Sequence, residues 1–254
     1  MTNSGLLVEL DDVGKVYPGG NVAIQNASLH AKEGEFLSFV GPSGCGKSTI
    51  FNMIAGLTGQ TSGQLSVLGT DPREARKKNE VAFVFQEHSL LPWATLVDNV
   101  AMPLKLRGVS RRERTEYSVR VLELVGLKDY VRALPGHLSG GMKMRVSIAR
   151  ALVARPRLLL MDEPFGALDE ITRQTLQNEL LRIWRQSDRM SVLFITHNVF
   201  EAVYLSTRVI VMTPRPGKIS QVIDIDAPFP REEAFRTTPE FGEYVRRVSE
   251  ALQH

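Results

Sequence analysis

Runs of apolar residues with the spacing of β-strands recur along this chain. In its second half they alternate with stretches of helical spacing. The runs that predict strands are LLVELDDVGKVY, VAIQNASLHA, EFLSFVG, VAFVFQ, RLLLMDE, SVLFITH, RVIVMT and GKISQVIDI. Because the later apolar strands alternate with helices, we expect a parallel sheet with helices on both faces. The first eighty residues are richer in strands, which predicts an antiparallel layer beside that sheet.

Stretches in which apolar residues recur every three or four positions predict amphipathic helices. One begins at Lys47, directly after a glycine-rich loop. Another runs from Ile171 to Gln186 and aligns Leu176, Leu180 and Trp184 on one face. Further helices are predicted over residues 111–125 and 138–154, and in the C-terminal stretch TTPEFGEYVRRVSEALQH, where Thr238 is the candidate N-cap.

These elements predict one α/β domain over residues 1–254. Its core, with the antiparallel β subdomain, comprises residues 1–86 and 156–230. Residues 87–155 are nearly all helical in pattern and lie between two predicted sheet strands, so we expect an inserted helical subdomain there. Residues 231–254 end in the C-terminal helix.

Composition supports an ordinary globular protein and narrows its partners. The chain of 254 residues is 43% apolar and 23% charged, with a formal net charge of only +3. This charge gives no strong electrostatic reason to bind nucleic acid. Cys45 is the single cysteine, so an internal disulfide is not expected and a reducing compartment fits. No signal peptide or membrane-spanning segment is expected, because no apolar run approaches about eighteen residues.

The sequence GPSGCGKST matches the phosphate-binding pattern G-x-x-x-x-G-K-[ST]. It follows a predicted strand and opens a predicted helix, which is the context that the pattern requires. Lys47 supplies positive charge for the β- and γ-phosphates, and the hydroxyl of Ser48 suits Mg²⁺. The candidate nucleotide-binding residues of this loop are Gly41, Pro42, Ser43, Gly44, Cys45, Gly46, Lys47, Ser48 and Thr49.

A second glycine-rich step, LSGGMKMRVSIARAL, begins at Leu138. Ser139, Gly140 and Gly141 lead into a predicted helix, so bare backbone N–H groups and the positive end of a helix again form a candidate phosphate site. One chain therefore carries two phosphate-binding loops, and the nucleotide site must account for both.

Polar residues follow several of the apolar strands at the end where α/β proteins bind ligands. The strand RLLLMDE ends in Asp162, a candidate Mg²⁺ ligand, and Glu163. On an extended strand end these two side chains point to opposite sides, so Glu163 is the candidate to face an attacking water. Two other strands end in Gln86 and His197. If these strands are parallel neighbours, their ends and Gly41 converge on one γ-phosphate.

In these motifs the chain closely resembles the ATP-binding subunits of ABC transporters, and the resemblance covers roughly Leu7 to Leu252. The resemblance implies a P-loop NTPase (RecA-like) core with an antiparallel β subdomain and an inserted helical subdomain. It implies ATP and Mg²⁺ as cofactors. The family's ordered motifs stand at Gly41–Thr49 (Walker A), Gln86 (Q-loop), LSGGM from Leu138 (signature), Asp162 (Walker B), Ala167–Asp169 (D-loop) and His197 (switch histidine).

The resemblance also implies roles for these residues. Glu163 polarises the attacking water, and His197 contacts the γ-phosphate. Gln86, with Ser48 and Asp162, touches Mg²⁺ and reports the nucleotide state to the helical subdomain. Asp169 couples the two halves of a dimer. Tyr17 stands where the family stacks an aromatic residue on adenine, although as a lone residue it fits a strand-packing tyrosine equally well.

Details of the sequence resemble the branch of this family that serves nitrate, sulfonate and taurine importers. Met142 replaces the usual glutamine of the signature, a change familiar in that branch. Met144 replaces a second glutamine, and the sequence offers no physical account of it. The stretch LLPWATLVDNVAMPLKLRGV and the tail TTPEFGEYV also look like that branch.

The resemblance implies a homodimer that clamps two ATP molecules, each between one Walker A loop and the partner's signature. It implies two separate transmembrane permease subunits, which hold this chain at the cytoplasmic face of the inner or plasma membrane, and, through them, a solute-binding protein. Nucleic acid is not an expected partner. Leu90, Leu91 and Trp93 follow Gln86 as an apolar cluster that either docks a permease helix or belongs to the core. The transported solute is open.

Three other functions fit these motifs less well. A P-loop kinase or GTPase has no need of LSGG. A soluble ABC ATPase of DNA repair or translation carries a coiled-coil insertion or two tandem cassettes, and the sequence shows neither. A non-hydrolysing regulatory subunit would be a binding module, but Lys47, Asp162, Glu163 and His197 are all intact.

Overall fold

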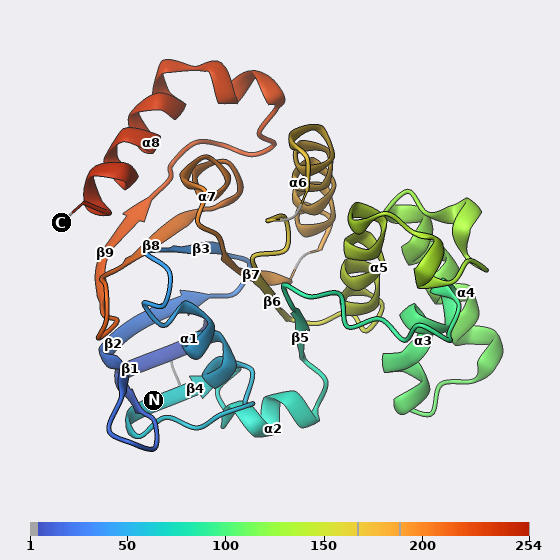
Figure 1. Cartoon of the computed structure of the whole chain (residues 1–254), viewed down its shortest axis with the longest axis horizontal. Helices are drawn as coiled ribbons and strands as arrows, with labels where there is room; N and C mark the ends of the chain where they lie inside the picture. The colour runs from blue at the N-terminus through green and yellow to red at the C-terminus, as the bar shows by residue number, and fades with distance from the viewer. Residues whose placement is uncertain (1–4, 167, 188, 254) are drawn as a thin grey trace.

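The computed structural model describes residues 5–166, 168–187 and 189–253 and contains two sheets (Figure 1). The larger sheet has six strands in the order β5-β6-β7-β3-β8-β9, and the smaller has three in the order β2-β1-β4. This is the mixed α/β arrangement predicted from the sequence, with an antiparallel layer beside a largely parallel sheet.

The larger sheet consists of β5 (Val81–Val84), β6 (Leu158–Asp162), β7 (Ser191–Ile195), β3 (Phe36–Val40), β8 (Arg208–Met212) and β9 (Ile219–Asp224). All neighbouring pairs are parallel except β8 and β9, which are antiparallel. The strands β3, β6 and β7 are buried along almost their whole length. A strand buried on both faces requires a continuous apolar run, and this is why these strands could be recognised in the sequence.

The smaller sheet consists of β2 (Val22–Lys32), β1 (Leu6–Val16) and β4 (Ser62–Val67), paired antiparallel. One face of this sheet contacts the core, and buried residues therefore recur in alternation along β2. The strand β4 was not predicted, because its sequence SGQLSV buries only Leu65 and Val67.

Both faces of the larger sheet are covered. Phe36, Val192 and Phe194 point to one face, where they pack with α6 (Glu170–Arg185), α7 (Val199–Leu205) and α8 (Pro239–Ala251). Leu37 and Phe39 point to the opposite face, where they pack with α1 (Lys47–Ile54) and the smaller sheet. Alternate residues of one strand thus enter two different apolar clusters, which fixes the register of the sheet.

Residues 87–155 form the predicted helical subdomain, which lies to one side of the core in Figure 1. It contains α3 (Leu96–Leu106), α4 (Arg111–Leu124) and α5 (Gly140–Leu152), with short 3₁₀ turns at Lys128–Tyr130 and Pro135–His137. These helices share an apolar cluster of their own around Val100, Leu122 and Val146. The chain enters this subdomain after β5 and leaves it before β6, as expected for an insertion between two neighbouring strands.

Several helix predictions are confirmed, and others were missed. Thr238 caps α8 by accepting a hydrogen bond from the amide of Phe241, as predicted. The helices α2 (Pro72–Lys77) and α7 were not predicted, and α3 falls in the region predicted to be helical without bounds of its own. A 3₁₀ turn at Glu233–Thr237 precedes α8.

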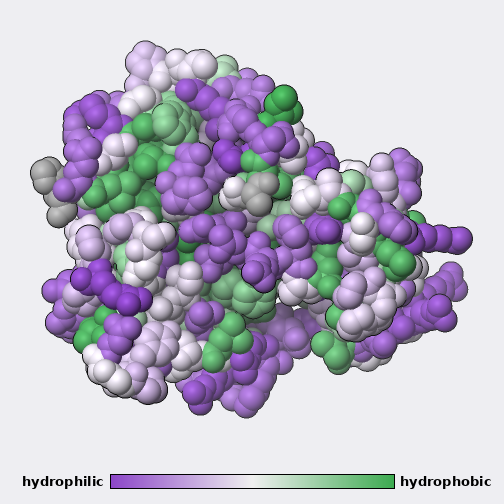
Figure 2. Space-filling model, viewed as in Figure 1, coloured by the Kyte–Doolittle hydropathy of each residue, from purple (hydrophilic) through white to green (hydrophobic). Residues whose placement is uncertain are grey.

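Hydrophilic side chains cover most of the face shown in Figure 2, and apolar side chains gather there in scattered patches. In the part of the chain that the structure describes, no helix is long and apolar enough to cross a membrane.

Candidate functional site

Four neighbouring strands of the larger sheet, β5, β6, β7 and β3, run parallel and end at the same edge. The loops that follow them carry Gln86, Glu163, His197 and the glycine loop from Gly41. The four strands are parallel neighbours, which was the condition for the predicted convergence of these residues. The glycine loop of β3 and the acidic end of β6 are two strands apart in the sheet, with β7 between them.

Glu163 lies at the centre of the catalytic candidates. Its Oε2 is 3.4 Å from the amide nitrogen Nε2 of Gln86 and 3.5 Å from Nδ1 of His197. These residues, with His88 and Met144, line a cavity of about 240 Å³. A carboxylate and an imidazole that line the same small cavity can orient and polarise a water molecule bound in it.

One premise of the sequence prediction was wrong. Asp162 and Glu163 do not share an extended strand end, because β6 ends at Asp162 and Glu163 has a φ of 45°. The backbone turns at this residue, and the Glu163 amide donates to the carbonyl of Ile195 at 3.1 Å. This turn, rather than strand alternation, sets the direction of the Glu163 side chain.

The glycine loop joins β3 to α1 and places its lysine against its own backbone. Lys47 is 6% exposed, and its ammonium donates to the carbonyls of Gly41 at 2.8 Å and Pro42 at 3.1 Å. Gly46 precedes the helix with a φ of 101°, a left-handed conformation that favours glycine. The loop therefore presents backbone N–H groups at the N-terminus of α1, where the helix dipole favours an anion.

Ser48 and Asp162 form the candidate metal pair. Burial raises the pKa of Asp162, and a hydrogen bond from Ser48 together with the charge of Lys47 opposes this rise. A hydroxyl beside a carboxylate is an oxygen donor set that suits Mg²⁺, so the residues present fit this ion. Gln86 contacts Glu163 rather than this pair.

Ser139, Gly140 and Gly141 lie at the start of α5, as predicted. The Ser139 hydroxyl accepts from the amide of Met142 at 3.3 Å and caps this helix. Together with Asp169 they line a cavity of about 460 Å³, which has only Leu168 in common with the cavity beside Glu163. No residue of the glycine loop Gly41–Thr49 lines the cavity of the second phosphate-binding step, so that cavity is separate from the glycine loop of the same chain.

Asp169 is the N-cap of α6, with its carboxylate accepting from the amide of Thr172 at 3.0 Å. Backbone and side-chain hydrogen bonds from Thr172 lower the pKa of Asp169. Ala167, the first residue of the predicted D-loop, lies outside the described residues. Tyr17 directly follows β1, is 37% exposed and has the ammonium of Lys15 5.3 Å from its ring centre.

The structure explains Met144 and adds residues that the sequence did not reveal. Met144 is 2% exposed and packs in the apolar cluster that joins α5 to the large sheet. An apolar side chain therefore suits this position. His88 also lines the cavity beside Glu163, and Arg145 lines the one beside Ser139.

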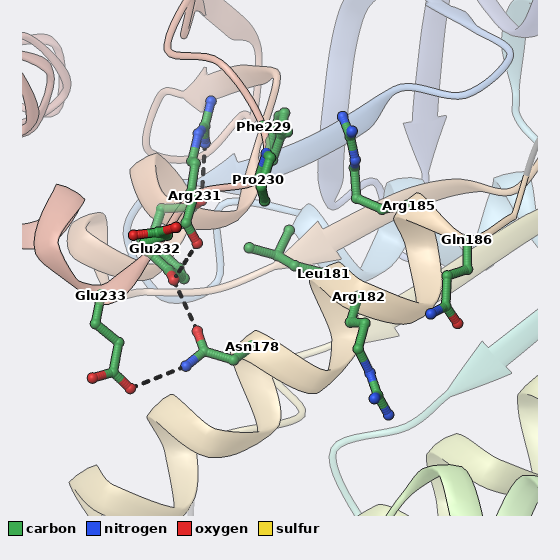
Figure 3. A pocket seen from close by; sticks show the side chains of 11 residues that line it. Asn178, Leu181, Arg182, Arg185, Gln186, Phe229, Pro230, Arg231, Glu232 and Glu233 are labelled. Atoms are coloured by element: carbon green, nitrogen blue, oxygen red, sulfur yellow. Dashed lines mark hydrogen bonds between the residues drawn. The ribbon is translucent and has the colours of Figure 1, made fainter.

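A further cavity, of about 340 Å³, lies between α6 and the segment that precedes α8 (Figure 3). It is lined by Leu181, Phe229 and several arginines, among them Arg182 and Arg185. None of the predicted site residues lines it, so it is separate from the candidate nucleotide site.

Comparison with known proteins agrees with this geometry. The family model described as ABC transporter matches residues 24–166. The solved structure of the ATP-binding cassette MJ0796 as a dimer in a post-hydrolysis state, bound to ADP and Pi, superimposes with a TM-score of 0.78. It is 31% identical in sequence, and the match covers 87% of this chain and 100% of that one.

Curated relatives match over most of their length. A Brucella abortus protein named only for ATP binding is 49% identical over 93% of this chain and 90% of its own. The aliphatic sulfonates import ATP-binding protein of Bacillus licheniformis is 44% identical over 89% of this chain and 85% of its own. The nitrate import ATP-binding protein of Synechocystis sp. is 42% identical over 97% and 95%, respectively. By these matches, and by the arrangement of its strand ends, the chain belongs to the ABC transporter family and is an ATP-hydrolysing, ATP-binding subunit.

Proposed function

We propose that two copies of this chain bind two ATP molecules between them, each held by the glycine loop of one copy and the signature of the other. The carrying observation is that the cavity at Ser139, Gly140 and Gly141 contains no residue of the glycine loop of the same chain in its lining. Ser139, Gly140 and Gly141 then bind the γ-phosphate of the partner's ATP. The solved MJ0796 cassettes, which are dimeric, support this arrangement.

Within each site, different residues of one chain have different roles. The loop Gly41–Thr49 binds the phosphates, and Lys47 exchanges its carbonyl partners for phosphate oxygens. Tyr17 stacks on adenine. Glu163 polarises the attacking water, and His197, whose Nδ1 lies 3.5 Å from Glu163 Oε2, contacts the γ-phosphate. Ser48 and Asp162 would hold Mg²⁺, which would neutralise phosphate charge, and Gln86 would join them by giving up its contact with Glu163.

We infer that nucleotide state reaches the helical subdomain through the segment after Gln86. The guanidinium of Arg150, on the signature helix α5, donates to the carbonyl of Ser89 at 2.7 Å and to its hydroxyl at 3.0 Å. Burial lowers the pKa of Arg150. Because these contacts tie the Gln86 segment to α5, a shift of Gln86 moves the signature as well.

The same segment presents the candidate docking site for a membrane subunit. Trp93 is 77% exposed, whereas Leu90 packs against the helical cluster. The loop around Trp93 is held by Asn99, which is fully buried and bonds to the amide and carbonyl of Leu91. A rigid loop with a protruding indole suits a groove on a partner helix. Trp93 and Leu91 therefore serve docking, and Leu90 serves the core.

The chain then powers solute import through two permease subunits that hold it at the cytoplasmic face of the membrane, with a solute-binding protein delivering the cargo. Relatives named for sulfonate and nitrate import support a small anionic solute of the nitrate, sulfonate or taurine type. The relatives from Brucella have no solute in their names and do not narrow this choice.

Purification of the tagged chain from membranes of the organism that carries it tests this proposal. Two integral membrane proteins should co-purify with wild type and be depleted with Trp93→Ala. A deletion strain should lose growth on a sulfonate as sulfur source or on nitrate as nitrogen source. Recovery of ATPase activity only in the soluble fraction would instead indicate an ABC ATPase that is not coupled to transport.

A further inference from the structure

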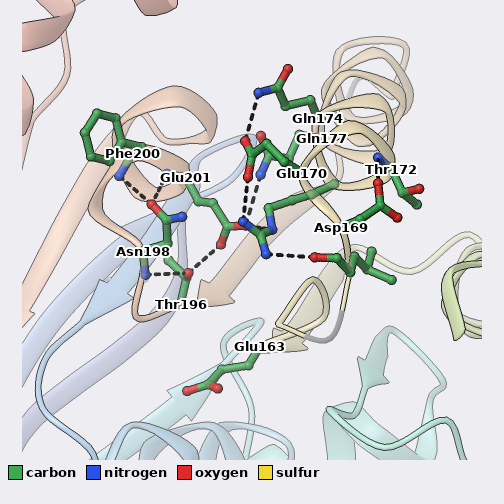
Figure 4. A network of polar contacts seen from close by, with 12 residues as sticks. Glu163, Asp169, Glu170, Thr172, Gln174, Gln177, Thr196, Asn198, Phe200 and Glu201 are labelled. Atoms are coloured by element: carbon green, nitrogen blue, oxygen red, sulfur yellow. Dashed lines mark hydrogen bonds and ion pairs between the residues drawn. The ribbon is translucent and has the colours of Figure 1, made fainter.

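A buried polar network lies beside the nucleotide site, on the α6 and α7 side of the sheet (Figure 4). Its central residue is Glu201 on α7, which is 6% exposed. The Glu201 carboxylate accepts from the Thr196 hydroxyl at 2.5 Å and from the Gln177 amide at 3.0 Å. Burying a carboxylate costs free energy unless its charge is paired and hydrogen-bonded, so the partners of Glu201 matter for the stability of this region.

One arm of the network fixes the switch loop, Thr196–Asn198, on both sides of His197. Thr196 is 2% exposed, and its hydroxyl also accepts from the amide of Asn198 at 3.0 Å. The side chain of Asn198 caps α7 by accepting from the amides of Phe200 at 2.9 Å and Glu201 at 3.3 Å. The backbone of His197 is thus held between two anchored residues, while its own side chain is 65% exposed towards the cavity.

The other arm holds the D-loop, of which Leu168 and Asp169 are described. Arg173, on the first turn of α6, donates from one guanidinium nitrogen to the carbonyl of Leu168 at 2.9 Å. Another guanidinium nitrogen pairs with the exposed carboxylate of Glu170 at 2.7 Å. Leu168 lies between the cavity of Glu163 and the cavity of Ser139, since it lines both.

The two arms meet where Arg173 faces Glu201. Arg173 Nε lies 3.5 Å from Glu201 Oε1, and it has no hydrogen-bond partner among the described residues. Burial raises the pKa of Glu201, and the charges of Arg173 and His197 oppose this rise. Arg173 thus supplies a positive charge beside this carboxylate from α6.

We infer that Arg173 and Glu201 are positioning residues for ATP hydrolysis, and that their buried pair sets the switch loop and the D-loop in one fixed relation. His197 faces the γ-phosphate of its own chain's site, and Asp169 faces the second copy, so the pair links closure of the dimer to alignment of the histidine. This inference rests on the roles of His197 and Asp169 in the proposed function.

A connection of this kind makes a distinct kinetic prediction. If the pair only stabilised the fold, its loss would lower the amount of active protein without changing the turnover of what remains. If it aligns His197, its loss lowers kcat while ATP affinity at the glycine loop is kept. In a variant that lacks the His197 side chain, loss of the pair should cause no further loss of kcat, because the imidazole that the pair aligns is missing.

The test measures kcat and KM for ATP, together with the thermal unfolding temperature, for Glu201→Gln, Arg173→Met and Arg173→Lys. Glutamine keeps the size of Glu201 but loses the charge that faces Arg173. We expect Glu201→Gln and Arg173→Met to lower kcat about tenfold, with KM changed less than about twofold. Lysine keeps the positive charge, so Arg173→Lys should recover part of this loss. Glu170→Gln is the matched control, because it removes the exposed partner of the same guanidinium and should keep wild-type turnover.

The decisive comparison repeats Glu201→Gln in a His197→Ala background. There we expect less than about a twofold further loss, and a full multiplicative loss would overturn the inference. Thr196→Val, which removes only the hydroxyl that Glu201 holds, gives a second route if Glu201→Gln folds poorly. A His197→Ala variant with wild-type turnover would refute the proposed role of the histidine itself. An impaired His197→Ala beside normal Glu201→Gln and Thr196→Val variants would refute the positioning pair alone.

Discussion

The backbone of Gly217 packs directly against the carbonyl oxygen of Cys45, so closely that a Cβ on Gly217 would overlap it. Gly217 is fixed on its other side by hydrogen bonds with Ala23 and Gln25, each at 3.0 Å. A neighbouring residue, Arg215, donates to the carbonyl of Gly44 at 3.1 Å. The loop after β8 therefore packs against the backbone of the glycine loop at Gly44 and Cys45.

Gly217→Ala should displace the glycine loop and weaken ATP binding, because neither backbone can retreat from the added methyl group. We expect a loss of stability of about 1–3 kcal/mol, typical of overpacking. Titration with a fluorescent ATP analogue and thermal unfolding measure the two effects. Gly242→Ala on α8 is the control, since an added Cβ there meets nothing within 4 Å. Equal affinity in both variants would show that the loop after β8 does not shape the site.

Ser139→Arg should leave ATP binding to the monomer intact and abolish hydrolysis, because it fills the signature cavity that receives the partner's nucleotide. The substitution also removes the cap of α5, a loss of about 1 kcal/mol by itself. Ser110→Arg controls for that loss, since Ser110 caps α4 by accepting from Glu113 at the same 3.3 Å. Steady-state ATPase assays should find Ser110→Arg active and Ser139→Arg inactive. Equal turnover in Ser139→Arg and wild type would exclude the composite site.

Glu201 should make stability depend on pH in a predictable direction. Its pKa is raised by burial, so between its ordinary value and the raised value the folded state binds more protons than the unfolded state. The contribution of Glu201 to the free energy of unfolding is therefore lost as pH rises through this window. Thermal unfolding of wild type and Glu201→Gln between about pH 4 and 7 should show the difference moving in favour of the variant. A difference that moves towards wild type would contradict the buried state of this carboxylate.

The strand ends could be predicted because their physical cause is local. A strand buried on both faces must be a continuous apolar run, and polar residues at its end stand out. Asp162 and His197 were found in this way, and the order of neighbouring strands met the condition for their convergence. The strand β4 and the helix α7 could not be found so easily. The first buries little. The second, VFEAVYL, is buried from Glu201 to Leu205, and its exposed residue, Phe200, is apolar, so the sequence shows no polar face.

The pair of Arg173 and Glu201 could not be predicted from the sequence for another reason. The contacts of Glu201 come from residues 173, 177 and 196, and no local pattern links them. The available signal was a single acidic residue inside an apolar run, which indicates a buried partner without naming it. The turn at Glu163 was likewise hidden, since φ at this residue depends on packing against β7 rather than on its neighbours in sequence.

The central claim, that ATP is held between two copies of this chain, is tested most directly with Glu163→Gln. The variant keeps the size of the side chain near Gln86 and His197 but cannot activate water, so ATP should bind and persist. We predict that its molar mass, measured by light scattering after gel filtration, doubles when ATP and Mg²⁺ are added and returns to that of a monomer when ATP is replaced by ADP. A monomer under all of these conditions, with ATP shown to be bound, would contradict the account.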